Sequence, residues 1–320
     1  MAEGPDPRGQ HFVTCQLCDD NVQFYCRPCK IRLCVKCVSP HLETNAPDHN
    51  IVYYHKRLGT TARSLHDPQI NGTILCGYHA MLCIRYAGKS RIFVSSHVSR
   101  DIKLFHTNGT LLNTLTPSSL AMYLTPYEDG VLYTGTGGIR KINHDGDQLF
   151  LPLEGNLTGI KFVEPNTIYV CKWSEVEKRT TGGKKLLSIK YNDQGDGIYG
   201  NAENISINGN GDICVAEYDA AGNIDSYIGV TVVDENGKYR FSYSTKPPSW
   251  PMDLCCDSDF QIIIAFISST IHVIDKDGHF LRKLEYSGID KPWSVTIDNR
   301  DNLFVSQMHD DFLRMVAYMH

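Results

Sequence analysis

From about residue 70 onward, short runs of β-branched and aromatic residues alternate with turns rich in Gly, Asn and Asp. Such runs, bounded by such turns, are typical of β-strands. The segment lacks the 3.6-residue apolar period that would predict an amphipathic helix. We therefore predict an all-β domain over residues 68–320.

One apolar triplet recurs along this domain at a nearly constant interval. The central residues of successive copies are 39, 37, 45, 49 and 41 residues apart. A repeat of about 40 residues that holds four short strands is typical of a propeller blade, so six copies predict a six-bladed β-propeller. The copies are IFV (92–94), VLY (131–133), IYV (168–170), ICV (213–215), III (262–264) and LFV (303–305).

Glycine-containing pairs lie between apolar runs at the same interval, where they predict type I′ hairpin turns. Asp234 and Asp275 each open a turn that resembles a calcium loop, but neither is followed by the late glutamate of an EF-hand, so we interpret both as hairpins. The pairs are Asn108-Gly109, Asp145-Gly146, Asn236-Gly237 and Asp277-Gly278. Gly182-Gly183 makes the turn of another hairpin, at 175–186.

The last repeat has three strands, the third at about 312–318, and an unpaired edge there would be an aggregation hazard. The run NGTILCGYH (71–79) is an unassigned strand just before the first repeat. We predict that residues Thr73 to Cys76 pair with the last repeat and close the ring.

The pattern is different near the start of the chain, where CQLCDDNVQFYCRPCKIRLCVKC (15–37) holds six of the twelve cysteines. Disulfides, a redox pair and metal are the alternatives. With two histidines that follow, the segment offers four ligand pairs, and two tetrahedral zinc ions need eight ligands. So short a segment lacks an adequate apolar core, so zinc would supply its folding energy, about 10–16 kcal/mol per ion. All ligands are protein atoms, which predicts structural rather than catalytic zinc.

Composition favours metal over disulfides. The chain has 320 residues, 42% of them hydrophobic and 21% charged, without a membrane-length apolar run or an apolar signal segment at its start. We expect a soluble cytoplasmic protein whose thiols are reduced.

The order of three C-x2-C pairs and two histidines, followed by NIVYYHKR (50–57), resembles a B-box zinc finger of the tripartite-motif family. The stretches 203–219 and 292–307 resemble its NHL repeat. The resemblance implies a leader (1–11), a B-box (12–56), a linker (57–67) and a propeller (68–320), without the RING finger or coiled coil of that family. It also implies interleaved ligands: Cys15, Cys18, Cys34 and Cys37 on one zinc ion, and Cys26, Cys29, His41 and His49 on the other.

The other cysteines fall inside strand runs, and we interpret them as small core residues. They are Cys76, Cys83, Cys171, Cys214, Cys255 and Cys256.

Some six-bladed propellers are enzymes that hold a metal in the central channel with carboxylates and amides from the inner strands. Asn204, Asp253 and Asp298 are the candidates here. They fall at different positions within their runs, so we interpret Asp253 and Asp298 as strand-end or turn residues.

The propeller carries 24 basic and 30 acidic residues after residue 57, a net charge of −6 that does not favour RNA. A local basic face remains an alternative, formed by Lys161, Lys172, Lys178, Arg179, Lys184 and Lys185.

The resemblance implies a non-catalytic adaptor whose propeller face recruits a target protein and whose B-box engages a second protein, and we expect no membrane partner. The resemblance implies a setting in ubiquitin signalling or innate immunity. The alternatives are an RNA-binding post-transcriptional regulator and a ubiquitin-protein ligase.

Overall fold

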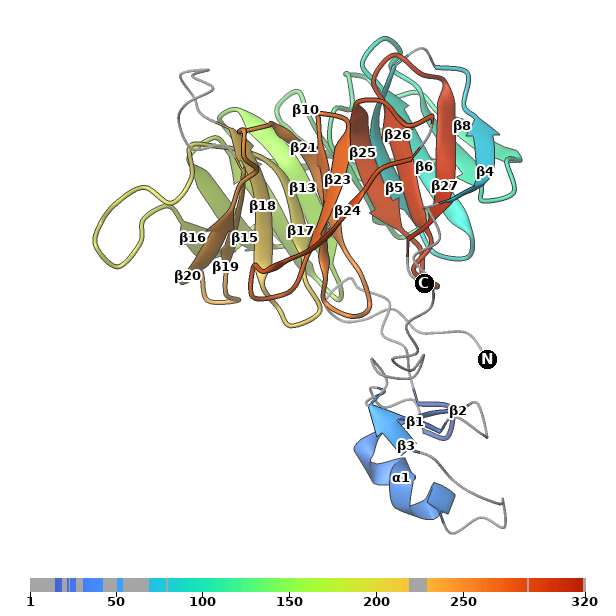
Figure 1. Cartoon of the computed structure of the whole chain (residues 1–320). Helices are drawn as coiled ribbons and strands as arrows, with labels where there is room; N and C mark the ends of the chain where they lie inside the picture. Colours follow the sequence, from blue (N-terminus) through green and yellow to red (C-terminus); the bar gives the residue numbers. More distant parts are fainter. Residues whose placement is uncertain are drawn as a thin grey trace. The chain divides into compact units, whose positions relative to one another are not determined.

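The computed structural model describes residues 15–18, 22, 24–26, 31–42, 51–53, 69–78, 80–218, 229–286 and 288–318. The chain divides into two compact units, Met1–Leu65 and His66–His320, and Figure 1 shows a small α/β unit and a large β unit.

The described part of the N-terminal unit contains an antiparallel sheet in the order β2-β1-β3 and one helix. Cys26 and Leu33, at the ends of β1 and β2, are fully buried, so a cysteine and a leucine provide much of this small interior. The elements are β1 (Phe24–Cys26), β2 (Ile31–Leu33), α1 (Val35–Leu42) and β3 (Ile51–Tyr53).

The described part of the second unit forms six four-stranded antiparallel sheets, which confirms the six-bladed propeller. Blades one and two are β5 (Met81–Tyr86), β6 (Arg91–Ser96), β7 (Ile102–His106), β8 (Leu111–Leu115), and β9 (Leu124–Tyr127), β10 (Gly130–Gly135), β11 (Gly138–Asn143), β12 (Gly146–Pro152). Blades three and four are β13 (Leu157–Val163), β14 (Thr167–Lys172), β15 (Glu175–Thr180), β16 (Lys185–Ile189), and β17 (Asn201–Ile207), β18 (Ile213–Tyr218), β19 (Gly229–Val233), β20 (Tyr239–Tyr243). Blades five and six are β21 (Pro251–Cys256), β22 (Ile262–Phe266), β23 (Thr270–Ile274), β24 (Phe280–Leu284), and β25 (Pro292–Ile297), β26 (Leu303–Gln307), β27 (Phe312–Ala317), β4 (Gln69–Leu75).

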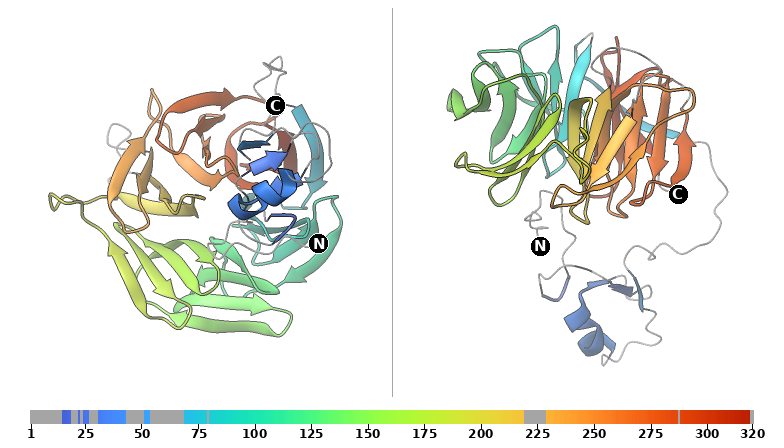
Figure 2. Two further views of the ribbon diagram at one scale, coloured as in Figure 1. Left: turned by 90° about the horizontal axis from the view of Figure 1, so that it is seen from below. Right: turned by 90° about the vertical axis from the view of Figure 1, so that its left-hand side faces the viewer.

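The sheets are arranged radially, as the left view of Figure 2 shows. The first strand of each blade is innermost, and each inner strand lies beside the next: β5, β9, β13, β17, β21, β25 and again β5. The six recurring triplets all lie in the second strand of a blade. These strands are buried on both faces, which explains why they are the most continuously apolar runs in the sequence.

The ring closes as the sequence predicts. β4 pairs antiparallel with β27, and Thr73 lies opposite Arg314. Cys76 lies just beyond β4, and its backbone N–H donates to the carbonyl of Asp311 at 2.8 Å. The last blade thus combines both ends of the domain, and its third strand is not left as an open edge.

The hairpin positions are confirmed, but the type I′ assignment is wrong. Type I′ turns need a positive φ at two successive residues, whereas here only the glycine has one, for example Gly109 at 95° and Gly237 at 87°. The Gly237 N–H donates to the Asp234 carbonyl at 2.9 Å, and the Asp234 carboxylate accepts the N–H groups of Asn236 and Lys238. The aspartate therefore caps a type I turn that ends at a left-handed glycine.

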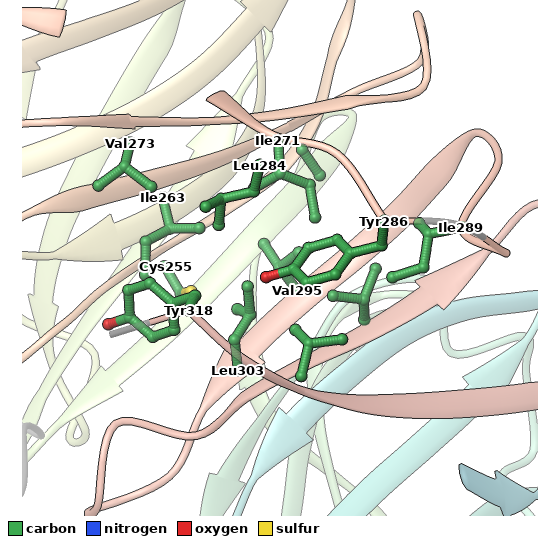
Figure 3. Close-up of a cluster of buried hydrophobic side chains, with 13 residues drawn as sticks. Cys255, Ile263, Ile271, Val273, Leu284, Tyr286, Ile289, Val295, Leu303 and Tyr318 are labelled. Atoms are coloured by element: carbon green, nitrogen blue, oxygen red, sulfur yellow. The ribbon is translucent and has the colours of Figure 1, made fainter. Parts of the chain in front are cut away.

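The core lies between the blades rather than within them. In the described part of the propeller, each pair of neighbouring blades encloses one apolar cluster. Figure 3 shows the cluster between blades five and six, where Cys255, Leu303 and Tyr318 pack together. Complete burial of such a side chain contributes about 1.5–3 kcal/mol. The six propeller cysteines predicted as core residues are all buried.

None of the described helices has the length and apolar character needed to cross a membrane.

Candidate functional site

Four cysteines of the N-terminal unit form the clearest candidate site. The sulfurs of Cys15, Cys18, Cys34 and Cys37 all lie within 4.8 Å of one another. The Cys18 sulfur is 3.4 Å from that of Cys34 and 3.2 Å from that of Cys37. Four thiolates bonded to one tetrahedral zinc ion at about 2.3 Å lie about 3.8 Å apart. The group can therefore hold one metal ion, and its members are those that the resemblance implied for the first site.

Backbone hydrogen bonds bring the two cysteine pairs together. The Gln16 N–H donates to the Arg32 carbonyl at 2.9 Å, and the Arg32 N–H donates to the Gln16 side chain at 2.7 Å. Cys34 directly precedes α1 and Cys37 lies in its first turn. The positive end of the helix dipole favours thiolates at this position.

Neighbouring groups shift the pKa values of two of these thiols, Cys15 and Cys37. Burial alone would raise the pKa of Cys15, but hydrogen bonds from the backbone of Leu17, Cys34 and Cys18 lower it to about 7. The hydrogen bond with Cys18 raises the pKa of Cys37 far above its ordinary value, and burial adds to the shift. Four thiolates this close repel one another, and a bound cation would relieve the repulsion.

The second predicted ligand set is described only in part. Cys26 at the end of β1 and His41 near the end of α1 are both buried. Cys29 and His49 lie outside the described residues.

The propeller axis holds a second cluster of polar side chains. The Arg85 guanidinium on β5 donates to both carboxylate oxygens of Asp253 on β21, at 2.7 and 3.1 Å. It also donates to Asn204 on β17 at 3.2 Å and to Ser294 on β25 at 3.3 Å. Blade one thus contacts blades four, five and six, of which blade four is opposite. Arg85 must therefore cross the axis.

This arrangement corrects one expectation. Asn204, Asp253 and Ser294 are each the first residue after a β-bulge in their inner strand, so they occupy the same position in three blades. Asp253 is a buried strand residue rather than a strand-end residue. Asp298 is a turn residue, as predicted, because its carboxylate accepts the N–H groups of Arg300 and Asn302. The sequence contained this correspondence, because each of the three residues lies ten positions before the central residue of the apolar triplet in its blade. It was missed because Asp298 was compared in place of Ser294.

Much of the positive charge on the predicted basic face of blade three is neutralised within the blade. Lys172, Arg179 and Lys185 all contact the carboxylate of Glu177, at 3.1, 2.6 and 3.1 Å. Burial would raise the pKa of Glu177, but these three hydrogen bonds outweigh it and lower the pKa to about 2. Lys161 is separate from this group, on the inner strand β13.

One face of the propeller carries exposed apolar side chains. In an antiparallel blade, the loop between the second and third strands lies at the same end as the loop that leads to the next blade. We call this end the apolar loop face, because six large apolar side chains are exposed among the described residues of its loops. They are Val98, Leu120, Met122, Trp173, Tyr191 and Trp250, with exposed fractions of 36 to 64%. Sequence reasoning missed them, although aromatic residues between strand runs were a usable signal.

A further hollow of about 310 Å³ lies between the outer strands of blades one and two. Its lining includes Asn113, Thr116, His144 and Asp147. These side chains are mainly polar and come from hairpins and outer strands, so the hollow offers no convergent catalytic group.

No protein-family model matches the chain, and no curated protein matches it. Many solved structures share the propeller, including the two that follow. Selenomethionine-substituted virginiamycin B lyase from Staphylococcus aureus is 14% identical, with a TM-score of 0.55, over 79% of this chain and 100% of that chain. The gluconolactonase XC5397 from Xanthomonas campestris is 12% identical, with a TM-score of 0.59, over 79% and 95%. At such identities the similarity shows the fold alone.

Proposed function

We propose that the chain is a non-catalytic adaptor that binds a target protein through the apolar loop face of its propeller. The exposed aromatic residues Trp173, Tyr191 and Trp250 carry this proposal. Trp and Tyr are enriched among residues that dominate binding energy, so three of them exposed in loops at the same end of the propeller support a binding role.

The N-terminal unit is proposed to be a B-box stabilised by two zinc ions that engages a second protein. The geometry of the Cys15, Cys18, Cys34 and Cys37 group supports one zinc ion, and the buried Cys26 and His41 are two of the four ligands that the resemblance implies for the other. Thiolate and imidazole ligands suit zinc. The resemblance to tripartite-motif proteins supports a setting in ubiquitin signalling or innate immunity, with ligase activity supplied by a partner.

A catalytic propeller is the principal alternative, since the two similar structures are named as a lyase and a gluconolactonase. The axial carboxylate, Asp253, is bound to Arg85 through both of its oxygens. A carboxylate held in this way is less available to bind a metal or accept a proton from a substrate, which favours the binding role.

The test compares two triple variants of the full chain in cells. The first replaces Trp173, Tyr191 and Trp250 with alanine. The matched control replaces Leu111, Leu186 and Phe280, which are equally exposed but lie on outer strands. Proteins that co-purify with the wild type are quantified for each variant. Each candidate partner is then purified, and its affinity for the wild type and for each variant is measured.

We expect the loop-face variant to lose at least one direct partner by about tenfold or more in affinity, as hot-spot truncation does. The control variant should keep it. Equal capture by all three proteins would contradict the proposal, and retention of RNA that weakens steeply with salt would favour the RNA-binding alternative.

A further inference from the structure

Trp173 has an unusual backbone conformation for so large a residue. Lys172 at the end of β14 pairs with Glu175 at the start of β15, so the loop between these strands consists of Trp173 and Ser174 alone. Trp173 has a φ of 36°, whereas Ser174 has no positive φ. A positive φ at the first of two loop residues is the pattern of a type II′ turn, which normally has glycine at that position.

This conformation is unfavourable for any residue that carries a side chain. With a positive φ the Cβ atom crowds a neighbouring backbone oxygen, and bulky residues are rarely found there. The corresponding two-residue loop of blade two contains Thr136 and Gly137, and its left-handed residue is the glycine, with a φ of 84°. Blade three therefore has a strained tryptophan in a loop where blade two has an unstrained glycine.

Packing of the indole does not account for this strain. Trp173 is 51% exposed and belongs to none of the apolar clusters in the described part of the propeller. Its backbone is nevertheless fixed, because the Trp173 carbonyl accepts the N–H of Ala202 in β17 at 2.6 Å. Strained residues that the surrounding structure holds in place are concentrated at functional sites.

The position of the indole restricts the shape of a partner. A side chain in a two-residue hairpin loop forms a convex projection, and about half of Trp173 remains in contact with water. Residues that dominate binding energy lie in well-packed pockets from which water is excluded. A folded domain can provide such a pocket, whereas a flexible peptide would first lose conformational entropy to form one.

We propose that Trp173 is a preorganised anchor that inserts into an apolar pocket of a folded partner domain. This inference rests on the proposed function of the apolar loop face and adds to it the anchoring residue and the kind of partner. The strained backbone holds the indole in place before the partner binds, so less conformational entropy is lost on association. The same strain lowers the stability of the free propeller.

The first measurement is the unfolding temperature of the propeller in the full, zinc-loaded chain. Trp173→Ala and Trp173→Gly both remove the indole, but only glycine also removes the strain. The glycine variant should therefore unfold about 2–4 °C above the alanine variant.

Ser174 is the matched control, since it is exposed and has no positive φ. There the order should reverse, with Ser174→Gly less stable than Ser174→Ala, because glycine only adds freedom to the unfolded chain. An alanine variant at position 173 that is as stable as the glycine variant would show that Trp173 is not strained, and would overturn the proposal.

The second measurement is the affinity for a purified partner that the loop-face triple variant fails to bind. Trp173→Ala and Trp173→Gly should each weaken binding by about tenfold or more. Lys89→Gly removes a left-handed residue with a φ of 49° from the opposite end of the propeller, and should leave the affinity unchanged. Unchanged affinity in both Trp173 variants would overturn this inference alone. Retention of every partner by the triple variant would contradict the proposed function as well.

The kind of partner is tested by competition. The folded partner is bound to the wild-type chain, and overlapping synthetic peptides that cover the sequence of the partner are added. None of them should displace it, because the pocket exists only in the folded domain. Displacement by one of the peptides would show that the target is a linear segment, and would overturn the proposed kind of partner.

Discussion

At the residue scale, the axis shows how a buried ion pair depends on its surroundings. Arg85 and Asp253 have side-chain exposures of 12% and 2%, and Asp253 also accepts hydrogen bonds from the N–H groups of Val295 and Leu254. Low dielectric strengthens this pair but also makes either charge costly alone. The sequence patterns did not single out Arg85 and placed Asp253 at a strand end, because no local pattern shows that four blades bring these side chains together.

Arg85→Met should lower the free energy of unfolding by about 3–5 kcal/mol, because it leaves the Asp253 carboxylate buried without its cation. Adding Asp253→Leu should cost less than the sum of the two single changes. Denaturant titration of the two single variants and the double variant checks this. Lys283→Met breaks an exposed pair with Glu285 and should change stability by only about 0–1 kcal/mol. Strict additivity of Arg85→Met and Asp253→Leu would contradict the coupling.

The carboxyl group of Glu217 predicts that the free energy of unfolding of the propeller depends on pH. It is buried, it accepts hydrogen bonds from Gly200 and Thr231, and burial raises its pKa from 4.5 to about 7. Between pH 4.5 and 7 the folded state therefore binds the proton more tightly than the unfolded state, so the free energy of unfolding falls as the pH rises.

Glu217→Gln should remove this loss, which amounts to about 3 kcal/mol between pH 4.5 and pH 8. Unfolding in urea at several pH values is the measurement. Because burial also raises the pKa of Asp257 to about 7, some pH dependence should persist in the variant. Parallel pH profiles for wild type and Glu217→Gln would show that Glu217 is not responsible.

At the element scale, the sequence predicted what depends on local pattern. The second strands, the hairpin positions and the pairing of β4 with β27 all follow from apolar runs and turn residues. The turn type did not follow, because an aspartate cap and one left-handed glycine leave the same Asp-Gly or Asn-Gly signature as a type I′ turn. Helix α1 was also missed, since eight residues with Pro40 inside give a weak helical signal.

The turn geometry predicts unequal costs for two glycine substitutions. A Cβ on Gly109 meets nothing within 4 Å, but the residue has a φ of 95°. Gly109→Ala should therefore lower the free energy of unfolding by about 1–2 kcal/mol from backbone strain alone. Gly197 also has open space around it but no positive φ, so Gly197→Ala should be neutral or slightly stabilising. Chemical denaturation compares them, and equal effects would refute the conformational explanation.

At the scale of the whole molecule, the two units depend on different forces. The propeller buries one apolar cluster between each pair of blades in its described part, whereas the described residues of the N-terminal unit bury few apolar side chains, such as Leu33. The cysteine spacing predicted a metal-binding segment, and the resemblance to a B-box implied the group of four that the structure shows. The sequence could not identify the binding partner, because the exposed side chains that form a binding surface follow no local pattern.

Metal removal should therefore affect the units differently. Cys34→Ser removes one ligand of the Cys15, Cys18, Cys34 and Cys37 group, so we expect the zinc content to fall from two ions per chain to one. Cys26→Ser should remove the other ion if the ligand sets interleave. Each change should unfold or loosen the N-terminal unit, because a structural zinc contributes about 10–16 kcal/mol to a small domain.

Zinc per chain is measured on protein purified under reducing conditions, and circular dichroism follows the β signal of the propeller. Cys171→Ala, a buried propeller cysteine, is the control that should keep both ions. Because the units are separate compact bodies, the propeller signal and its unfolding temperature should persist in Cys34→Ser. Loss of the propeller signal in this variant would show that the N-terminal unit is needed for the propeller to fold. An unchanged zinc content would contradict the assignment of Cys34 as a zinc ligand.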